Sequence, residues 1–144
     1  MPSFLTHLEC SRCGRVYDAD RLQNTCADDG RPLLARYDLT AVRRALPRAA
    51  LAGREASLWR YRELLPIADE AQIATLGEGW SPLLPCPRLG AALGLERLLV
   101  KDEGQLPTGS FKARGMAVAV SRARELGARV LAAPSAGNAG AALA

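Results

Sequence analysis

A lysine lies in a glycine-containing turn in the second half of this chain. Lys112 ends the stretch PTGSFK (107–112), and the chain has only two lysines, Lys101 and Lys112, against seventeen arginines. Arginine stays protonated, whereas a desolvated lysine amine can lose its proton and form a Schiff base. Arg114 is a neighbouring cation that would favour the neutral amine. The pattern therefore predicts a chemically active lysine, although a lysine without these flanking residues would be expected to be a solvated surface side chain.

A second loop has the composition of a ligand-binding turn. Residues 135–140 read SAGNAG and lead into a helical pattern. Backbone N–H groups at the start of a helix favour an anion. Taken alone, glycine and asparagine indicate only a turn, so the functional prediction depends on this loop lying near Lys112.

The elements around these two segments predict that they converge. Residues 98–101 and 129–133 read as buried strands, with a helix over 110–127 between them and a further helix from 140. Strand, helix, strand and helix at this spacing predict a βαβ unit in a parallel sheet. Ligands of such sheets bind beyond the carboxyl ends of the strands, where Lys112 and loop 135–140 would both lie.

Two cysteine-containing turns lie near the N-terminus. Cys10 and Cys13 form a Cys-x-x-Cys knuckle, and Cys26 is followed three residues later by Asp29, where a second knuckle would have its other cysteine. Two facing knuckles supply four tetrahedral zinc ligands, and aspartate can be one of them. The alternatives are a degenerate knuckle that no longer binds metal tightly, or His7 as a substitute ligand.

The chain divides into three expected parts. Residues 1–36 form a zinc-ribbon-like module, residues 37–72 a helical linker, and residues 73–144 the start of a catalytic α/β domain. The linker has short helical patterns at 40–46 and 57–65, the second with Ser57 as its N-cap. We expect Trp59, in the second of these, to pack against a neighbouring domain.

Composition narrows the function classes. The 144 residues are 49% hydrophobic with a net charge of +4 from dispersed arginines. No basic stripe with interleaved aromatics appears, so we expect no nucleic-acid partner. No signal peptide or membrane-spanning run is apparent, so we expect a cytoplasmic protein without a membrane partner, in which clustered cysteines indicate metal more than disulfides.

Five stretches resemble the pyridoxal-phosphate enzymes of the tryptophan synthase β-like fold (fold type II), and within them the threonine synthases. They are LWRY (58–61), TLGEGWSPL (75–83), KDEG (101–104), PTGSFK (107–112) and SAGN (135–138). The cysteine knuckles also resemble the N-terminal extension of many members. The resemblance covers almost the whole chain and implies an α/β fold with an incomplete parallel-sheet catalytic domain, because the family's phosphate-binding glycine cup would lie further on.

The resemblance also implies residue roles. Lys112 would form the internal aldimine with pyridoxal 5'-phosphate and then act as general base and acid, and Asn138 would hydrogen-bond the cofactor's phenolic oxygen. The substrate carboxylate would lie in the loop formed by Ser135, Ala136, Gly137 and Ala139. Cys10, Cys13, Cys26 and Asp29 would be the ligands of a zinc ion.

The implied activity is a lyase that converts O-phosphohomoserine and water to threonine and phosphate. The full-length form would act on this small amino-acid substrate and could be a homo-oligomer, and residues 1–144 alone would be inactive. Ala113 stands where threonine synthases usually have aspartate. This departure leaves open a threonine or serine dehydratase or a cysteate synthase, and a non-catalytic truncated product with a metal-binding ribbon is a further alternative.

Overall fold

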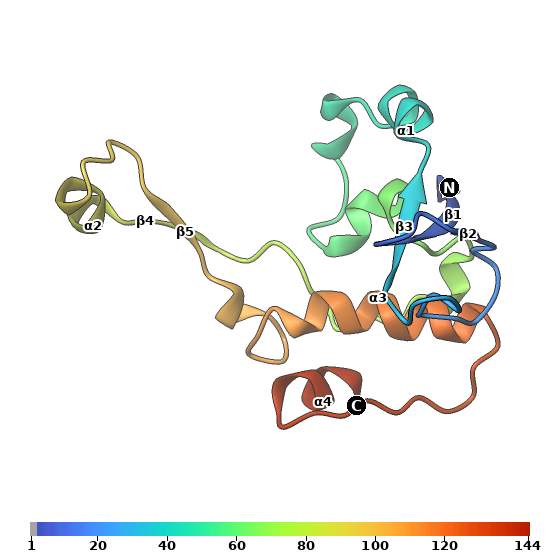
Figure 1. Cartoon of the computed structure of the whole chain (residues 1–144). Coiled ribbons are helices and arrows are strands. Elements are labelled where there is room, and N and C mark those ends of the chain that lie inside the picture. Colours follow the sequence, from blue (N-terminus) through green and yellow to red (C-terminus); the bar gives the residue numbers. More distant parts are fainter. Residues whose placement is uncertain (1–2) are drawn as a thin grey trace.

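The computed structural model describes residues 3–144 and arranges them around one long helix (Figure 1). A small antiparallel sheet lies near one end of helix α3 (Lys112–Glu125), and an arm projects from the other end. Short helices fill the connection between the sheet and the arm. The chain is therefore a mixed α/β protein, and no helix in its described part has the length and apolar character needed to cross a membrane.

The N-terminal sheet has three strands in the order β2-β1-β3. The central strand β1 (Leu5–Cys10) pairs antiparallel with β2 (Val16–Tyr17) and with β3 (Leu33–Tyr37). Because β1 ends at Cys10 and β3 begins at Leu33, both cysteine turns lie at the same end of the sheet.

The helical connection begins directly after β3. Helix α1 (Leu39–Ala45) is capped by Asp38, whose carboxylate accepts a hydrogen bond from the N–H of Ala41, and the 3-10 helices η1 (Arg48–Leu51), η2 (Leu58–Leu64) and η3 (Glu70–Gln72) follow. Both short helices expected from the sequence are present. Ser57 is the N-cap of η2, as expected, because its hydroxyl accepts the N–H of Trp59 at 3.1 Å.

Two buried carboxylates stabilise this connection. Trp59 is only 3% exposed, and its indole N–H donates to Glu78 Oε1 at 2.8 Å. Trp59 thereby packs against the chain beyond residue 73, as expected. Glu63, 1% exposed, accepts two hydrogen bonds from the Arg54 guanidinium at 2.6 and 2.7 Å. This bidentate pairing lowers the pKa of Glu63 below its ordinary value.

Breaking this ion pair should destabilise the fold. The variant Glu63→Gln leaves the largely buried Arg54 charge without a carboxylate, which costs about 3–5 kcal/mol at buried pairs. Urea unfolding of the full-length protein should show this loss. The matched variant Glu55→Gln removes a half-exposed carboxylate 3.7 Å from Arg62, and its unfolding free energy should change by less than about 1 kcal/mol. Equal effects of the two variants would contradict a structural role for the buried pair.

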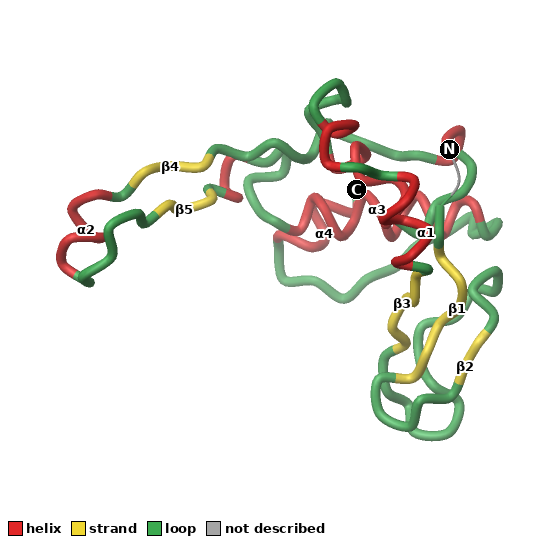
Figure 2. The backbone as a smooth tube through the Cα atoms, turned by 90° about the horizontal axis from the view of Figure 1, so that it is seen from above, coloured by secondary structure: helices red, strands yellow, loops and turns green. Residues whose placement is uncertain are grey.

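The arm is an antiparallel hairpin with a helical tip. Strand β4 (Leu83–Pro85) and strand β5 (Leu99–Lys101) pair with Leu84 opposite Val100, and helix α2 (Pro87–Ala92) lies between them. Figure 2 shows the hairpin projecting away from the rest of the chain. Its leucines are strongly exposed, with Leu93 at 61% and Leu83 at 56%.

The expected parallel sheet is not formed within residues 3–144. Strand β5 matches the first expected strand, but it is exposed and pairs antiparallel with β4. Residues 129–133 form no strand, and Val130 is 85% exposed. A strand requires a neighbour for its N–H and C=O groups, and no segment of the described chain pairs with these residues. The prediction of a βαβ unit inside this chain was therefore wrong, whereas the helix expected at 110–127 is α3.

Helix α3 joins the parts of the molecule. The Arg122 guanidinium donates to Ala19 O and to Asp20 Oδ1, both at 2.8 Å, in the loop that follows β2. One Glu125 oxygen accepts the N–H groups of Ala68 and Asp69 at 2.8 and 2.7 Å. The last turns of α3 therefore bind both the N-terminal module and the helical connection, while its first turn remains available to the candidate site.

Candidate functional site

Lys112 is the first residue of α3 and follows a tight loop. The loop closes through the N–H of Gly109, which donates to Leu106 O at 2.7 Å, and Gly109 has a positive φ of 67° that favours glycine. The side chain of Lys112 is exposed, with its Nζ 4.6 Å from the centre of the Phe111 ring. No carboxylate within residues 3–144 forms an ion pair with it.

Two hydroxyl groups beside Lys112 lack partners. Thr108 Oγ1 and Ser110 Oγ are both buried and make no hydrogen bond within the described chain. Buried polar groups are nearly always satisfied, so such a pair requires an explanation. A polar ligand beside the lysine would supply the missing acceptors or donors. The residues present therefore fit a cofactor that places polar groups at this turn.

Arg114 does not act as the free neighbouring cation considered from the sequence. Its guanidinium pairs with Glu103 through hydrogen bonds of 2.6 and 2.9 Å, and it also donates to Ser81 Oγ at 3.2 Å. Glu103 lies in the 3-10 helix η4 (Glu103–Gln105). The Arg114 hydrogen bond, assisted by the Ser81 hydroxyl, lowers the pKa of Glu103 from 4.5 to about 2.

This ion pair gives stability a defined pH dependence. Because the pKa of Glu103 is lower in the folded chain than in the unfolded chain, its stabilisation is complete above pH 4.5 and is lost as the pH falls from 4.5 towards 2. In Arg114→Gln the unfolding free energy should therefore decline less steeply across this window. Acid titration monitored by circular dichroism would measure it, with Arg97→Gln on the arm as the charge-matched control. Identical acid profiles for the two variants would show that the pair does not contribute.

The second expected segment is an exposed turn that leads into helix α4 (Asn138–Leu143). The Ser135 hydroxyl organises it by accepting the N–H groups of Gly137 at 3.1 Å and Gly140 at 2.8 Å. Gly140 lies so close to Ser135 that an added Cβ would be 3.3 Å from its side chain. Ser135, Ala136, Gly137 and Asn138 are exposed, and Ala139 is half-buried.

The two expected segments lie on packed helices. Helix α4 packs against α3, and Figure 1 shows it beneath the half of α3 that begins with Lys112. No hydrogen bond links Lys112 with Asn138 in residues 3–144. The structure thus brings the helices together, and it does so by helix packing rather than by the parallel strands expected from the sequence.

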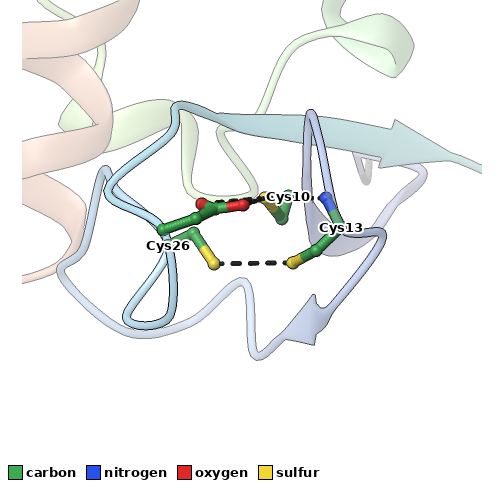
Figure 3. A group of neighbouring side chains, drawn as sticks. Cys10, Cys13 and Cys26 are labelled. Atoms are coloured by element: carbon green, nitrogen blue, oxygen red, sulfur yellow. Dashed lines mark hydrogen bonds between the residues drawn. The ribbon is translucent and has the colours of Figure 1, made fainter.

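The four residues expected to bind metal form one cluster. One ligand atom from each of Cys10, Cys13, Cys26 and Asp29 lies within 4.8 Å of the others. Cys13 Sγ is 3.7 Å from Cys26 Sγ, and Cys10 Sγ is 3.4 Å from Asp29 Oδ1. Four tetrahedral ligands about 2.3 Å from zinc are about 3.8 Å apart. Figure 3 shows the three thiols converging between the two turns, so the spacing suits a zinc ion.

The two turns have the same backbone geometry. In each, the cysteine N–H donates to the carbonyl of the arginine five residues later, Arg15 at 2.9 Å and Arg31 at 2.8 Å. In each, a glycine with positive φ, Gly14 or Gly30, donates back to the cysteine carbonyl. Asp29 therefore occupies, in the second turn, the place that Cys13 has in the first. The aspartate knuckle retains the backbone of a metal-binding turn.

Neighbouring donors favour the anionic forms of two of the four ligands, Cys26 and Asp29. The Tyr17 hydroxyl donates to Cys26 Sγ at 3.1 Å and lowers the pKa of this thiol below its ordinary value. The N–H of Arg31 donates to Asp29 Oδ1 at 3.0 Å and lowers the pKa of Asp29. His7 is not part of the cluster, because its ring bonds the Thr6 hydroxyl at 2.9 Å and faces Glu9. The alternative with His7 as a ligand is therefore excluded by this geometry.

Sequence reasoning missed several of these partners. Tyr17 reaches Cys26 from the neighbouring strand β2, and its only signal is an aromatic residue four positions after Cys13. The unpartnered hydroxyls of Thr108 and Ser110 lie within the stretch that drew attention to Lys112. Their polar types were visible, but their burial was not.

A comparison with protein families matches the second half of the chain. Residues 74–144 match the profile of the family described as "Pyridoxal-phosphate dependent enzyme". This region belongs to that family. The matched residues include Lys112, Arg114 and loop 135–140.

Individual relatives extend the match into the cysteine module. The chain is 45% identical over 135 residues to threonine synthase from Methanocaldococcus jannaschii, covering 94% of this chain and 33% of that protein. It is 41% identical to threonine synthase from Methanosarcina acetivorans, covering 96% of this chain and 33% of the relative. A match to threonine synthase from Halalkalibacterium halodurans, 46% identical, covers 61% of this chain and 26% of the relative. The chain thus spans about a quarter to a third of the length of these relatives.

Proposed function

We propose that these residues are part of a threonine synthase-like lyase that uses pyridoxal phosphate to convert O-phosphohomoserine and water to threonine and phosphate. The observation that carries the proposal is the free Lys112 amine in its turn with two unpartnered buried hydroxyls, within a region that belongs to the cofactor's family. Identity of 41–45% to two threonine synthases over almost the whole chain supports the substrate.

Four residues of this chain would contact the cofactor, each with a different role. Lys112 would hold the cofactor covalently, and its amine would then take a proton from the substrate and return it at another carbon. Thr108 and Ser110 would hydrogen-bond polar groups beside it, and Asn138 would hydrogen-bond the cofactor's phenolic oxygen. When bound, the cofactor supplies an electron sink for negative charge on the substrate carbons.

The substrate carboxylate would lie in the exposed turn before α4. Ser135, Ala136, Gly137 and Ala139 form this turn, whose small side chains leave the backbone accessible. Ser135 already fixes the turn through its two accepted hydrogen bonds. This arrangement would position the amino acid by its carboxylate and leave its side chain free to react.

The substrate assignment has one specific competitor. Ala113 is 3% exposed and offers no carboxylate beside Lys112, which favours a threonine or serine dehydratase or a cysteate synthase-like enzyme as the second candidate. Full-length protein should release phosphate from O-phosphohomoserine, with threonine as the product. Ammonia release from threonine or serine, without phosphate release, would identify a dehydratase instead.

We also propose that Cys10, Cys13, Cys26 and Asp29 hold a structural zinc ion in a ribbon formed by residues 1–36, ahead of a connection at 37–72 and the catalytic region at 73–144. The four ligand atoms within 4.8 Å and the matching backbone of the two turns support it. Zinc would stabilise a module whose three short strands bury little apolar surface. A non-catalytic role as a metal-binding ribbon alone would not account for the unpartnered hydroxyls beside Lys112 or for the family match of residues 74–144.

Residues 1–144 produced alone should associate and bind the cofactor weakly. Several leucines are 45–63% exposed: Leu84, Leu93 and Leu99 on the arm and Leu22 in the N-terminal module. Exposed apolar surface of this kind promotes association. Light scattering and cofactor titration would measure both properties, with the full-length protein as the reference. A monodisperse sample of residues 1–144 with stoichiometric cofactor and turnover would contradict this prediction.

A further inference from the structure

A cavity on the other side of the Arg114 ion pair is lined by cations. Its volume is about 460 Å³, and Arg60, Lys101 and Arg114 all contribute to its wall, together with Trp80 and Ser81. Lys112 does not line it. Arg114 lies two positions beyond Lys112 on α3, and residues two apart on a helix point in widely different directions. The cavity is therefore separate from the candidate cofactor turn.

Arg60 is the cation without a counter-charge. It is only 6% exposed, and its Nε and Nη1 atoms have no hydrogen-bond partner in the described part of the chain. No carboxylate within residues 3–144 forms an ion pair with it. Its guanidinium contacts the Leu51 carbonyl, the face of the Trp80 ring at 4.3 Å from the ring centre, and the Tyr61 ring at 5.8 Å. A buried charge without a partner is strongly unfavourable, so this arginine indicates a missing anion.

The nearby carboxylates are already occupied. Glu103 accepts the hydrogen bonds of Arg114 and the Ser81 hydroxyl. Glu78 accepts the Trp59 indole N–H at 2.8 Å and the Thr75 hydroxyl at 3.0 Å. Within residues 3–144, Lys101 Nζ donates only to the Ser81 carbonyl, at 2.9 Å. The wall of the cavity therefore has two cations, Arg60 and Lys101, that form no close ion pair with a carboxylate within residues 3–144, although the charge of Lys101 helps to lower the pKa of Glu103.

The backbone holds this wall in a fixed and strained form. The N–H of Leu58 donates to Glu78 O at 2.7 Å, and a Cβ on Gly79 would lie 2.5 Å from Leu58 N. Trp80, the next residue, has a positive φ of 51° and is 65% exposed. Non-glycine residues in this conformation concentrate at functional sites. This close approach is what places the Trp80 ring over Arg60.

We propose that this cavity is an anion site, distinct from the cofactor turn, that binds the phosphoryl group of inorganic phosphate or of a small phosphate ester. The anion would accept hydrogen bonds from Arg60 and Lys101, and the Ser57 hydroxyl in the wall would add a further donor. The proposal does not depend on the reaction catalysed at Lys112, because it rests on the charges of this cavity alone.

Calorimetric titration of the cofactor-saturated full-length protein with inorganic phosphate tests the proposal, with chloride at equal ionic strength as the salt control. We expect saturable binding that Lys101→Met weakens about tenfold or more, as for loss of a charged hydrogen-bond donor. Arg97→Met removes one charge on the arm and should bind phosphate as the unaltered protein does. Using Lys101 rather than the buried Arg60 keeps the variant folded.

Two further measurements make the result decisive. Methyl phosphate that binds as tightly as inorganic phosphate would identify the phosphoryl group of an ester as sufficient, whereas weaker binding would identify the free dianion as the ligand, and both results support the site. Absence of saturable binding would show that another part of the protein supplies the anion and would overturn the proposal. Equal phosphate affinity of Lys101→Met and the unaltered protein would overturn it as well.

Discussion

Replacing Lys112 with arginine should reduce turnover of the full-length enzyme by about 100-fold to 10,000-fold, the contribution typical of a positioned acid-base group. Arginine keeps the positive charge at the start of α3 but cannot form a covalent link to the cofactor or give up its proton. The loss should appear in kcat measured by phosphate release from O-phosphohomoserine. Folding should be retained, because the Lys112 side chain is exposed and forms no ion pair within residues 3–144.

The second lysine provides a control of the same chemical type. Lys101→Arg is the same lysine-to-arginine substitution, made at the end of β5, where Lys101 Nζ donates to a backbone carbonyl. This variant should keep the absorbance of the covalently bound cofactor, and Lys112→Arg should lose it. Retention of this absorbance in Lys112→Arg would show that the reactive lysine lies elsewhere.

Removing metal from the cysteine cluster should unfold the N-terminal module. Structural zinc contributes about 10 kcal/mol or more to small modules of this type, and strands β1, β2 and β3 have few other buried contacts. Purified full-length protein should carry about one zinc per chain. After chelation, hydrogen exchange over residues 5–37 should become fast, while α3 should retain protection in its last turns through the contacts of Glu125.

Two variants separate the metal site from a degenerate knuckle. Asp29→Cys restores a fourth thiolate in a turn that already has the matching backbone, so zinc should dissociate more slowly from it. Cys86→Ser alters a cysteine on the arm outside the cluster, and metal content should not change. Protein without metal, whose hydrogen exchange does not respond to added zinc, would support the degenerate knuckle.

Local signals in the sequence predicted several features correctly. The Ser57 cap depends on a residue two positions away, and helix α3 depends on a continuous pattern that ends at Gly127, where φ is 82°. The two cysteine turns are similarly encoded by spacings of three to five residues. Features of this kind follow from short-range sterics and hydrogen bonding.

Features that depend on distant partners could not be predicted in the same way. Residues 129–133 have the composition of a buried strand, yet strand formation also requires a neighbour, and β5 pairs with β4 instead. The pairing of Glu103 with Arg114 spans 11 positions. The stacking of the Arg60 guanidinium over the Trp80 ring depends on the close backbone approach at Gly79. Such contacts are set by packing between segments rather than by local propensity.

The central claim is that Lys112 carries the cofactor, and its most direct test is borohydride reduction of the full-length protein with bound pyridoxal phosphate, followed by peptide mapping. Reduction converts the covalent lysine link to a stable adduct. We predict one adduct per active site, on the peptide that contains Lys112. An adduct on Lys101, or on a lysine outside residues 1–144, would contradict the account.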